Sequence, residues 1–259
     1  MLENFRIDDY PVGIAAILLS VAVIITCQII ITRFIGKEAL RKSHEVGGYY
    51  LSLVGTTYAV LLGLVVFDAM AKFQRAEKIV QTEAKSVVAV YSISEQFPKE
   101  EAIIKGLLRD YVDEVINNEW SMMGKGEISE KARHLVLTLI HTIKKIEPIT
   151  QNQQGVYPTL ISETVSLWES RQDRTRPANF GIPTAEWVIL LIGAAITISF
   201  TFFFTIETQG IDIVMRGMAT VLIAISLYLV LLFGAPFGGD LRVSDEPFSA
   251  VRNIITKYL

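Results

Sequence analysis

Small and polar side chains gather on one side of a long predicted helix that begins near Glu45. At about 100° per residue, one stripe collects the following residues: Glu45, Gly48, Ser52, Gly55, Thr56, Ala59 and Gly63. Hydroxyl groups such as those of Ser52 and Thr56 solvate ions, so the stripe could line a water-filled path. Small residues at four-residue spacing are equally typical of a seam where two helix backbones approach closely. Both interpretations stay open, and the pore-lining candidates are Ser52, Thr56, Ala59 and Gly63.

A second group of candidate functional residues is cationic. Arg171, Arg174 and Arg176 lie shortly before a predicted membrane span. Arginines in such a position typically contact lipid headgroups. In an oligomer they could instead form a positive ring at a pore mouth. We therefore treat these arginines, with Glu45 at the start of the stripe helix, as candidates for pore-mouth or headgroup contacts.

The residue types of catalytic and metal sites form no convincing motif. Cys27 is the only cysteine, which excludes a disulfide within the chain and a cysteine-based metal site. His134 and His141 share a helix face, but helical zinc pairs prefer four-residue spacing and no third ligand stands out. The sequence contains no phosphate-binding loop and no nucleophile–base pair, so we expect no enzyme activity. A net charge of −3 argues against a nucleic-acid partner.

The elements that position these residues are predicted to cross a membrane. The chain is 51% hydrophobic, and long apolar runs cover 11–32, 46–67, 187–206 and 217–239. The second run corresponds to about 33 Å of helix, which is enough to span a bilayer. No proline follows it before Pro98, so we expect this helix to continue out of the membrane. Asp68 lies four residues before Lys72, which predicts an ion pair near the membrane interface.

Residues 73–184 are predicted to form a helical soluble domain. Apolar residues recur at helical spacing over 100–118, Ser129 is a predicted N-cap for a helix to 146, and another helix covers 158–171. The fold class is therefore all-α, with this domain inserted between spans 2 and 3 and span 2 continuing into it. The predicted divisions are 1–72, 73–184, 185–239 and a C-terminal tail, 240–259. In the tail region, Phe237 and Phe248 are expected to pack against the membrane-proximal ends of the spans.

Several of these segments together resemble a known family. The run Glu45-Val-Gly-Gly48 is followed by Gly55-Thr-Thr-Tyr58-Ala-Val-Leu-Leu62 and then by Glu83-Ala84. With the arginine segment and the Pro-Phe pairs of 236–248, they resemble an uncharacterised bacterial family described as bestrophin-like, DUF4239. The resemblance implies a homo-oligomer of four-span subunits, a helical cytosolic part and an axial anion pore lined by the second span. Bestrophins also bind calcium, and acidic residues lie in comparable places: Asp8, Asp9, Asp240, Asp245 and Glu246.

From the residues and the resemblance together, we expect a homo-oligomeric ion channel for chloride or another small anion. Its partners would be further copies of itself, the lipid bilayer and small inorganic ions. Its location would be the bacterial inner (plasma) membrane. Lys and Arg near the span ends favour a cytoplasmic soluble domain. Two alternatives stay open: a cation channel, and a non-conducting membrane-anchored helical interaction or signalling module.

Overall fold

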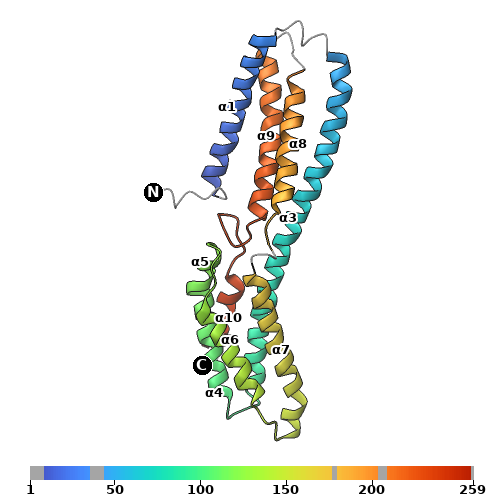
Figure 1. Cartoon of the computed structure of the whole chain (residues 1–259). Helices are drawn as coiled ribbons and strands as arrows, with labels where there is room; N and C mark the ends of the chain where they lie inside the picture. Colours follow the sequence, from blue (N-terminus) through green and yellow to red (C-terminus); the bar gives the residue numbers. More distant parts are fainter. Residues whose placement is uncertain (1–8, 36–43, 177–179, 204–208, 258–259) are drawn as a thin grey trace. The chain divides into compact units, whose positions relative to one another are not determined.

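The computed structural model describes residues 9–35, 44–176, 180–203 and 209–257, and these contain helices and no strands. The all-helical prediction is confirmed for this part of the chain. The elements in chain order are α1 (Tyr10–Ile35), α3 (His44–Ser94), α4 (Glu101–Glu114), the π-helix η1 (Val115–Glu119), α5 (Trp120–Met123), α6 (Glu130–Lys144), α7 (Gln151–Thr175), α8 (Thr184–Thr201), α9 (Gln209–Phe233) and α10 (Glu246–Lys257). Figure 1 labels the α-helices.

The chain divides into two compact units. The first, here called the membrane unit, comprises 1–72, 181–235 and 239–241. The second, the helical unit, comprises 73–180, 236–238 and 242–259. α3 contributes its first part to the membrane unit and its second part to the helical unit.

Four described helices are long and apolar enough to cross a membrane, as the sequence predicted: the candidate spans are Tyr10–Ile31, Gly48–Ser94, Thr184–Thr201 and Gly210–Phe233. The fourth helix begins before the apolar run that starts at 217, because α9 includes Asp212 and Arg216. These two side chains pair with each other across one helical turn. The pairing lets a charged turn extend an apolar helix.

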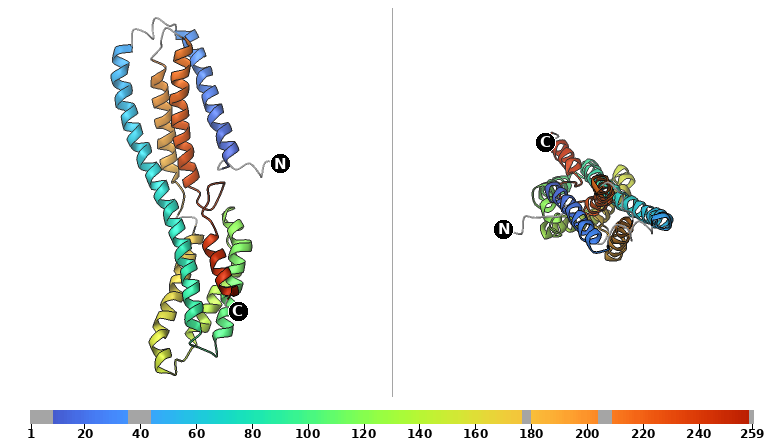
Figure 2. Two further views of the ribbon diagram at one scale, coloured as in Figure 1. Left: turned by 180° about the vertical axis from the view of Figure 1, so that it is seen from behind. Right: turned by 90° about the horizontal axis from the view of Figure 1, so that it is seen from above.

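In the membrane unit, α1 lies against α9, α9 against α8, and α8 against the first part of α3 (Figure 2). The core is formed by Tyr58, Leu62, Leu190, Ala194 and Val230. Gly193 makes the approach of α3 and α8 possible, since a Cβ atom there would lie 2.5 Å from the Tyr58 ring. The predicted pair is confirmed, with Lys72 Nζ 2.7 Å from Asp68 Oδ2.

The helical unit packs α4 against α6 and α10, and α6 against α7. Ser129 caps α6 as predicted, because its side chain accepts a hydrogen bond from the Ala132 amide. α7 begins at Gln151 rather than at the predicted residue 158. The reason is a capping box of Thr150 and Gln153, which starts the helix upstream of Pro158.

Candidate functional site

The stripe on α3 is exposed within a single chain. Ser52, Thr56, Ala59 and Gly63 are all exposed. A Cβ atom added at Gly55 or Gly63 would meet nothing within 4 Å. No described helix of the same chain therefore packs on these two glycines, and a seam at them would need another molecule.

The other sides of α3 have a different character. Tyr58 and Leu62, which are buried against α8 and α9, lie about 110° around the helix from the stripe. Bulky apolar residues occupy the remaining side, with Leu53, Leu64 and Phe67 between 62% and 72% exposed. The stripe thus separates a packed face from a face suited to lipid. Glu45 lies in α3, but its side chain is outside the described part.

Arg171 and Arg174 lie inside the helical unit, on neighbouring turns of α7, where they are 2% and 1% exposed. Arg174 binds Glu83 through two nitrogens, Nε to Oε2 at 2.6 Å and Nη2 to Oε1 at 2.9 Å. Its Nη2 also donates to Glu119 Oε2 at 2.8 Å. Arg171 Nη2 donates to Glu119 Oε1 at 2.5 Å and to the Ser129 carbonyl at 3.0 Å.

This buried cluster differs from the expected headgroup or pore-mouth contacts. In the described structure, two of the three arginines are engaged by buried carboxylates of the helical unit. Arg176 is exposed, and for it the membrane role stays a prediction. One signal in the sequence indicated a partner: Glu83 lies on the apolar face of α3, between Val80 and Val87, which are fully buried. A carboxylate on such a face requires a cation or a strong hydrogen-bond donor.

The electrostatics of the cluster are those of tightly paired groups. Burial raises the pKa of the Tyr111 phenol, and Glu83, which accepts the Tyr111 hydroxyl hydrogen bond, raises it further. Burial alone would lower the pKa of Arg174, but the carboxylates of Glu83 and Glu119 hold it well above its ordinary value. The Tyr111 phenol and the Arg174 guanidinium therefore keep their protons at physiological pH.

Glu119 reaches the arginines from the end of η1. In this π-helical segment the backbone is wider than an α-helix, and it continues directly into α5. The Glu119 side chain is completely buried and also accepts a hydrogen bond from the Ser129 amide at 3.2 Å. π-Helical turns often occur at functional sites. The sequence did not predict this segment, because no residue pattern marks the extra residue of a π-turn.

Aromatic rings surround the Arg174 guanidinium. The rings of Trp120 and Phe248 lie 5.5 and 5.6 Å from it. Phe237 packs edge-on against Trp120 at 5.9 Å, and Phe180 against Phe237 at 5.4 Å. Phe237 and Phe248 are thus buried, as expected, but their described partners belong to the helical unit rather than to the ends of the spans.

The acidic calcium candidates are only partly described. Asp240 Oδ2 accepts a hydrogen bond from the Tyr10 amide at 2.7 Å, which joins the start of α1 to the segment after α9. The backbone carbonyl of Asp245 accepts hydrogen bonds from the amides of Phe248 and Ser249 at the start of α10. The Glu246 side chain is exposed. Asp8 lies outside the described residues. Where the structure describes the chain, no three acidic, His or Cys side chains come together as metal ligands, so calcium stays a prediction.

A polar cluster that the sequence did not predict lies in the membrane unit. Arg216 Nη2 contacts Asp212 Oδ1 at 3.0 Å, and Gln28 Nε2 of α1 donates to Asp212 Oδ2 at 2.7 Å. The Arg216 guanidinium also lies 5.3 Å from the Phe202 ring. These contacts connect α1 to α9, and because Asp212 and Arg216 are buried, the paired charges are shielded from lipid.

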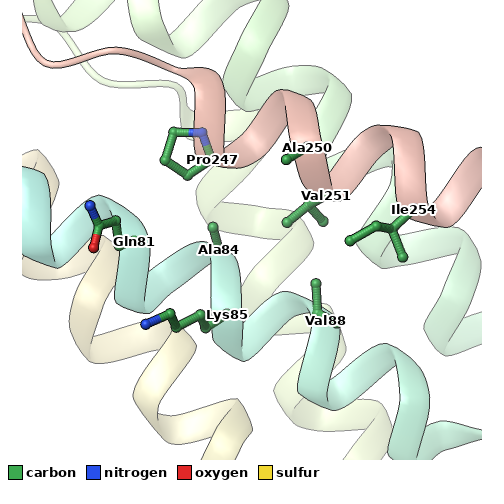
Figure 3. Close-up of a pocket in the computed structure, with 8 residues that line it drawn as sticks. All are labelled: Gln81, Ala84, Lys85, Val88, Pro247, Ala250, Val251 and Ile254. Atoms are coloured by element: carbon green, nitrogen blue, oxygen red, sulfur yellow. The ribbon is translucent and has the colours of Figure 1, made fainter.

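The helical unit also has a groove of about 340 Å³ between α3 and α10, shown in Figure 3. Its floor is apolar, with Ala84, Val88, Val251 and Ile254, while Gln81 and Lys85 bring polar groups to the α3 side. The volume is at the lower end of the range for small-molecule sites. No convergent set of polar groups lines it, and we assign it no ligand.

Comparison with known proteins agrees with this arrangement of helices. A family model described as the Bestrophin-like domain matches residues 18–248. The chain belongs to the bestrophin-like family. For this bestrophin-like chain, a search of curated proteins finds no match.

Solved structures share the bestrophin-like fold over nearly the whole chain. A variant of a bacterial bestrophin homologue from Klebsiella pneumoniae matches with a TM-score of 0.66 and 16% identity, covering 93% of this chain and 96% of that one. Another variant from the same organism matches with a TM-score of 0.67 and 13% identity, covering 93% and 98%. A structure described only as a membrane protein gives 0.65 and 15%, covering 93% and 96%. At these identities the likeness concerns the fold.

Proposed function

We propose that this protein is an ion channel formed by several copies of the chain, with the α3 stripe of each copy facing a shared central pore. Membership of the bestrophin-like family supports a channel. The observation that carries the pore assignment is the exposure of Ser52, Thr56, Ala59 and Gly63 on the first part of α3, whose other sides carry mainly packed or bulky apolar residues.

The packing of one subunit favours a pore shared between copies. The core where α3, α8 and α9 meet is apolar, with Leu62, Leu190 and Val230 among its members. Ions do not cross such a core, because they would lose their hydration without gaining polar contacts. Copies arranged around an axis would instead bring several stripes together and enclose water between them.

The permeating ion is proposed from the resemblance to bestrophins. Chloride or another small anion fits that resemblance, while the hydroxyls of Ser52 and Thr56 solvate either sign of ion, so a cation channel is the second candidate. The proposed location is the bacterial inner membrane, with the helical unit in the cytoplasm. DUF4239 is the proposed narrower family. Calcium is a proposed ligand, and we assign no set of residues to bind it.

The test is ion flux through the purified protein in liposomes. Ser52→Leu and Thr56→Leu should each reduce flux by about tenfold or more, since a narrow apolar constriction excludes water. Leu61→Met is the matched control, because Leu61 is 42% exposed on the side of α3 away from the stripe. Its flux and its assembly, measured by light scattering, should equal those of the parent.

Three other outcomes would change the proposal. Normal assembly and normal flux in both leucine variants would remove the stripe from the pore wall. Failed assembly would assign the stripe to a packing seam between copies. A parent that passes no chloride, nitrate, potassium or sodium, with or without calcium, would favour the non-conducting module. Orientation is tested separately by labelling Ser121→Cys in a Cys27→Ser background, where reaction with an impermeant thiol reagent in intact cells would contradict a cytoplasmic helical unit.

A further inference from the structure

Glu83 belongs to the same helix as the proposed pore-lining stripe. α3 is one α-helix of 51 residues, and it contains no proline. At about 1.5 Å per residue it is about 75 Å long. A contact that fixes Glu83 therefore acts on the element that carries Ser52 and Thr56.

Glu83 is held by a two-point ion pair with Arg174, in which both side chains are completely buried, and it also accepts a hydrogen bond from the Tyr111 hydroxyl. Two parallel hydrogen bonds between a guanidinium and a carboxylate fix direction as well as distance. The other described polar contacts from this part of α3 to α7 are weaker: the Ser86 Oγ atom lies 3.0 Å from Glu163 Oε2 and 2.9 Å from Ser166 Oγ.

Stability alone is a poor explanation of this pair. Burying two charges costs desolvation energy, and apolar replacements of buried ion pairs are often neutral or stabilising. What a two-point buried pair provides is a single allowed arrangement of the two helices, because any shift of α3 along α7 breaks both hydrogen bonds.

Arg174 cannot follow such a shift, because three other segments hold its guanidinium. Glu119 of η1 accepts from Nη2, and the rings of Trp120 in α5 and Phe248 in α10 lie within 5.6 Å. Arg174 is thus anchored to the rest of the helical unit, whereas Glu83 is its contact on α3.

We propose that the Glu83–Arg174 pair is a clamp that sets the position of α3, and that Arg174 is a positioning residue for ion permeation. The inference rests on the proposed function, since it matters for flux only if α3 lines the pore. It predicts that weakening the clamp frees the second part of α3 and changes flux through assembled channels, beyond any loss of stability.

The experiment compares Glu83→Gln with Glu119→Gln. Both carboxylates are completely buried and both pair with Arg174, but only Glu83 lies on α3. Hydrogen exchange of backbone amides and ion flux per assembled channel are measured for each variant. A merely structural role would loosen the contacts around each substituted residue but leave the flux per assembled channel equal in the two variants.

For Glu83→Gln we expect amide exchange over residues 74–90 to rise by about tenfold and flux to change by about threefold or more. For Glu119→Gln we expect faster exchange over residues 115–132, with α3 exchange and flux within about twofold of the parent. Should Glu83→Gln fail to assemble, Arg174→Lys replaces it, because lysine keeps the buried charge but not the two-point contact.

Equal exchange patterns in the two carboxylate variants, or unchanged α3 exchange in Glu83→Gln, would overturn the clamp. Faster α3 exchange with unchanged flux would overturn the role in permeation. If the parent itself passes no ions, the proposed function fails, while the exchange measurement still decides whether the clamp exists.

Discussion

Phe248 is completely buried at the start of α10, and its replacement by alanine should lower the thermal stability of the solubilised protein. Its ring packs against Tyr111 at 6.4 Å, Trp120 at 5.9 Å and the Arg174 guanidinium at 5.6 Å. These neighbours lie in three different helices. Tyr111 and Trp120 have rigid rings, and the Arg174 guanidinium is held by Glu83, so they cannot collapse into the space that the Phe248 ring would leave.

The magnitude follows from that environment. A Phe→Ala change in a packed core costs about 3–5 kcal/mol. For a protein of this size, each kcal/mol shifts the melting temperature by about 2–4 °C, so we expect a decrease of about 6–20 °C. The assay is thermal unfolding in detergent, followed by tryptophan fluorescence, because Trp120 lies in contact with the substituted position.

Ile254→Ala is the control for this prediction. Ile254 lies on the same helix but is 40% exposed, so its truncation should cost about 1 kcal/mol or less. A decrease below about 3 °C for Phe248→Ala, or one equal to that of the control, would refute the reasoning. It would mean that α10 contributes little to the folding of the helical unit.

Two further predictions concern other contacts. The pKa of Glu114 is lowered from its ordinary value of 4.5: burial alone would raise it, but hydrogen bonds from Ser129, Lys131 and Asn118 outweigh burial. The group therefore stabilises the fold above that value, and the stabilisation should be lost as pH falls through its lower folded pKa, so acid-unfolding curves of Glu114→Gln should be less steep than those of the parent. Gly193→Ala should destabilise the membrane unit by about 1–3 kcal/mol because the new Cβ atom would overlap the Tyr58 ring, whereas Gly217→Ala, with nothing within 4 Å, should be neutral in the same melting assay.

Several local features could be read from the sequence because their signals are local. The cap at Ser129 and the pair of Asp68 with Lys72 depend on residues three or four positions apart, and both are present in the structure. At α9 the local signal was only partly used. Asp212 and Arg216 lie at the spacing of a helical ion pair, but they precede the apolar run at 217 from which the fourth span was predicted. Their third partner, Gln28, comes from another helix and could not be predicted from local spacing.

Hydropathy and helical periodicity by themselves determined the helical class, the four apolar helices and the position of the stripe on α3, because each depends on residues within one helix. Tertiary structure alone decided that Arg174 meets Glu83, which is 91 positions away, and Glu119, which is 55 positions away. It also decided that the stripe stays exposed while Tyr58 and Leu62 are packed. The physical reason is that a helix pattern states which side chains share a face, whereas partners across the fold depend on how the helices pack and on a π-turn that no local pattern marks.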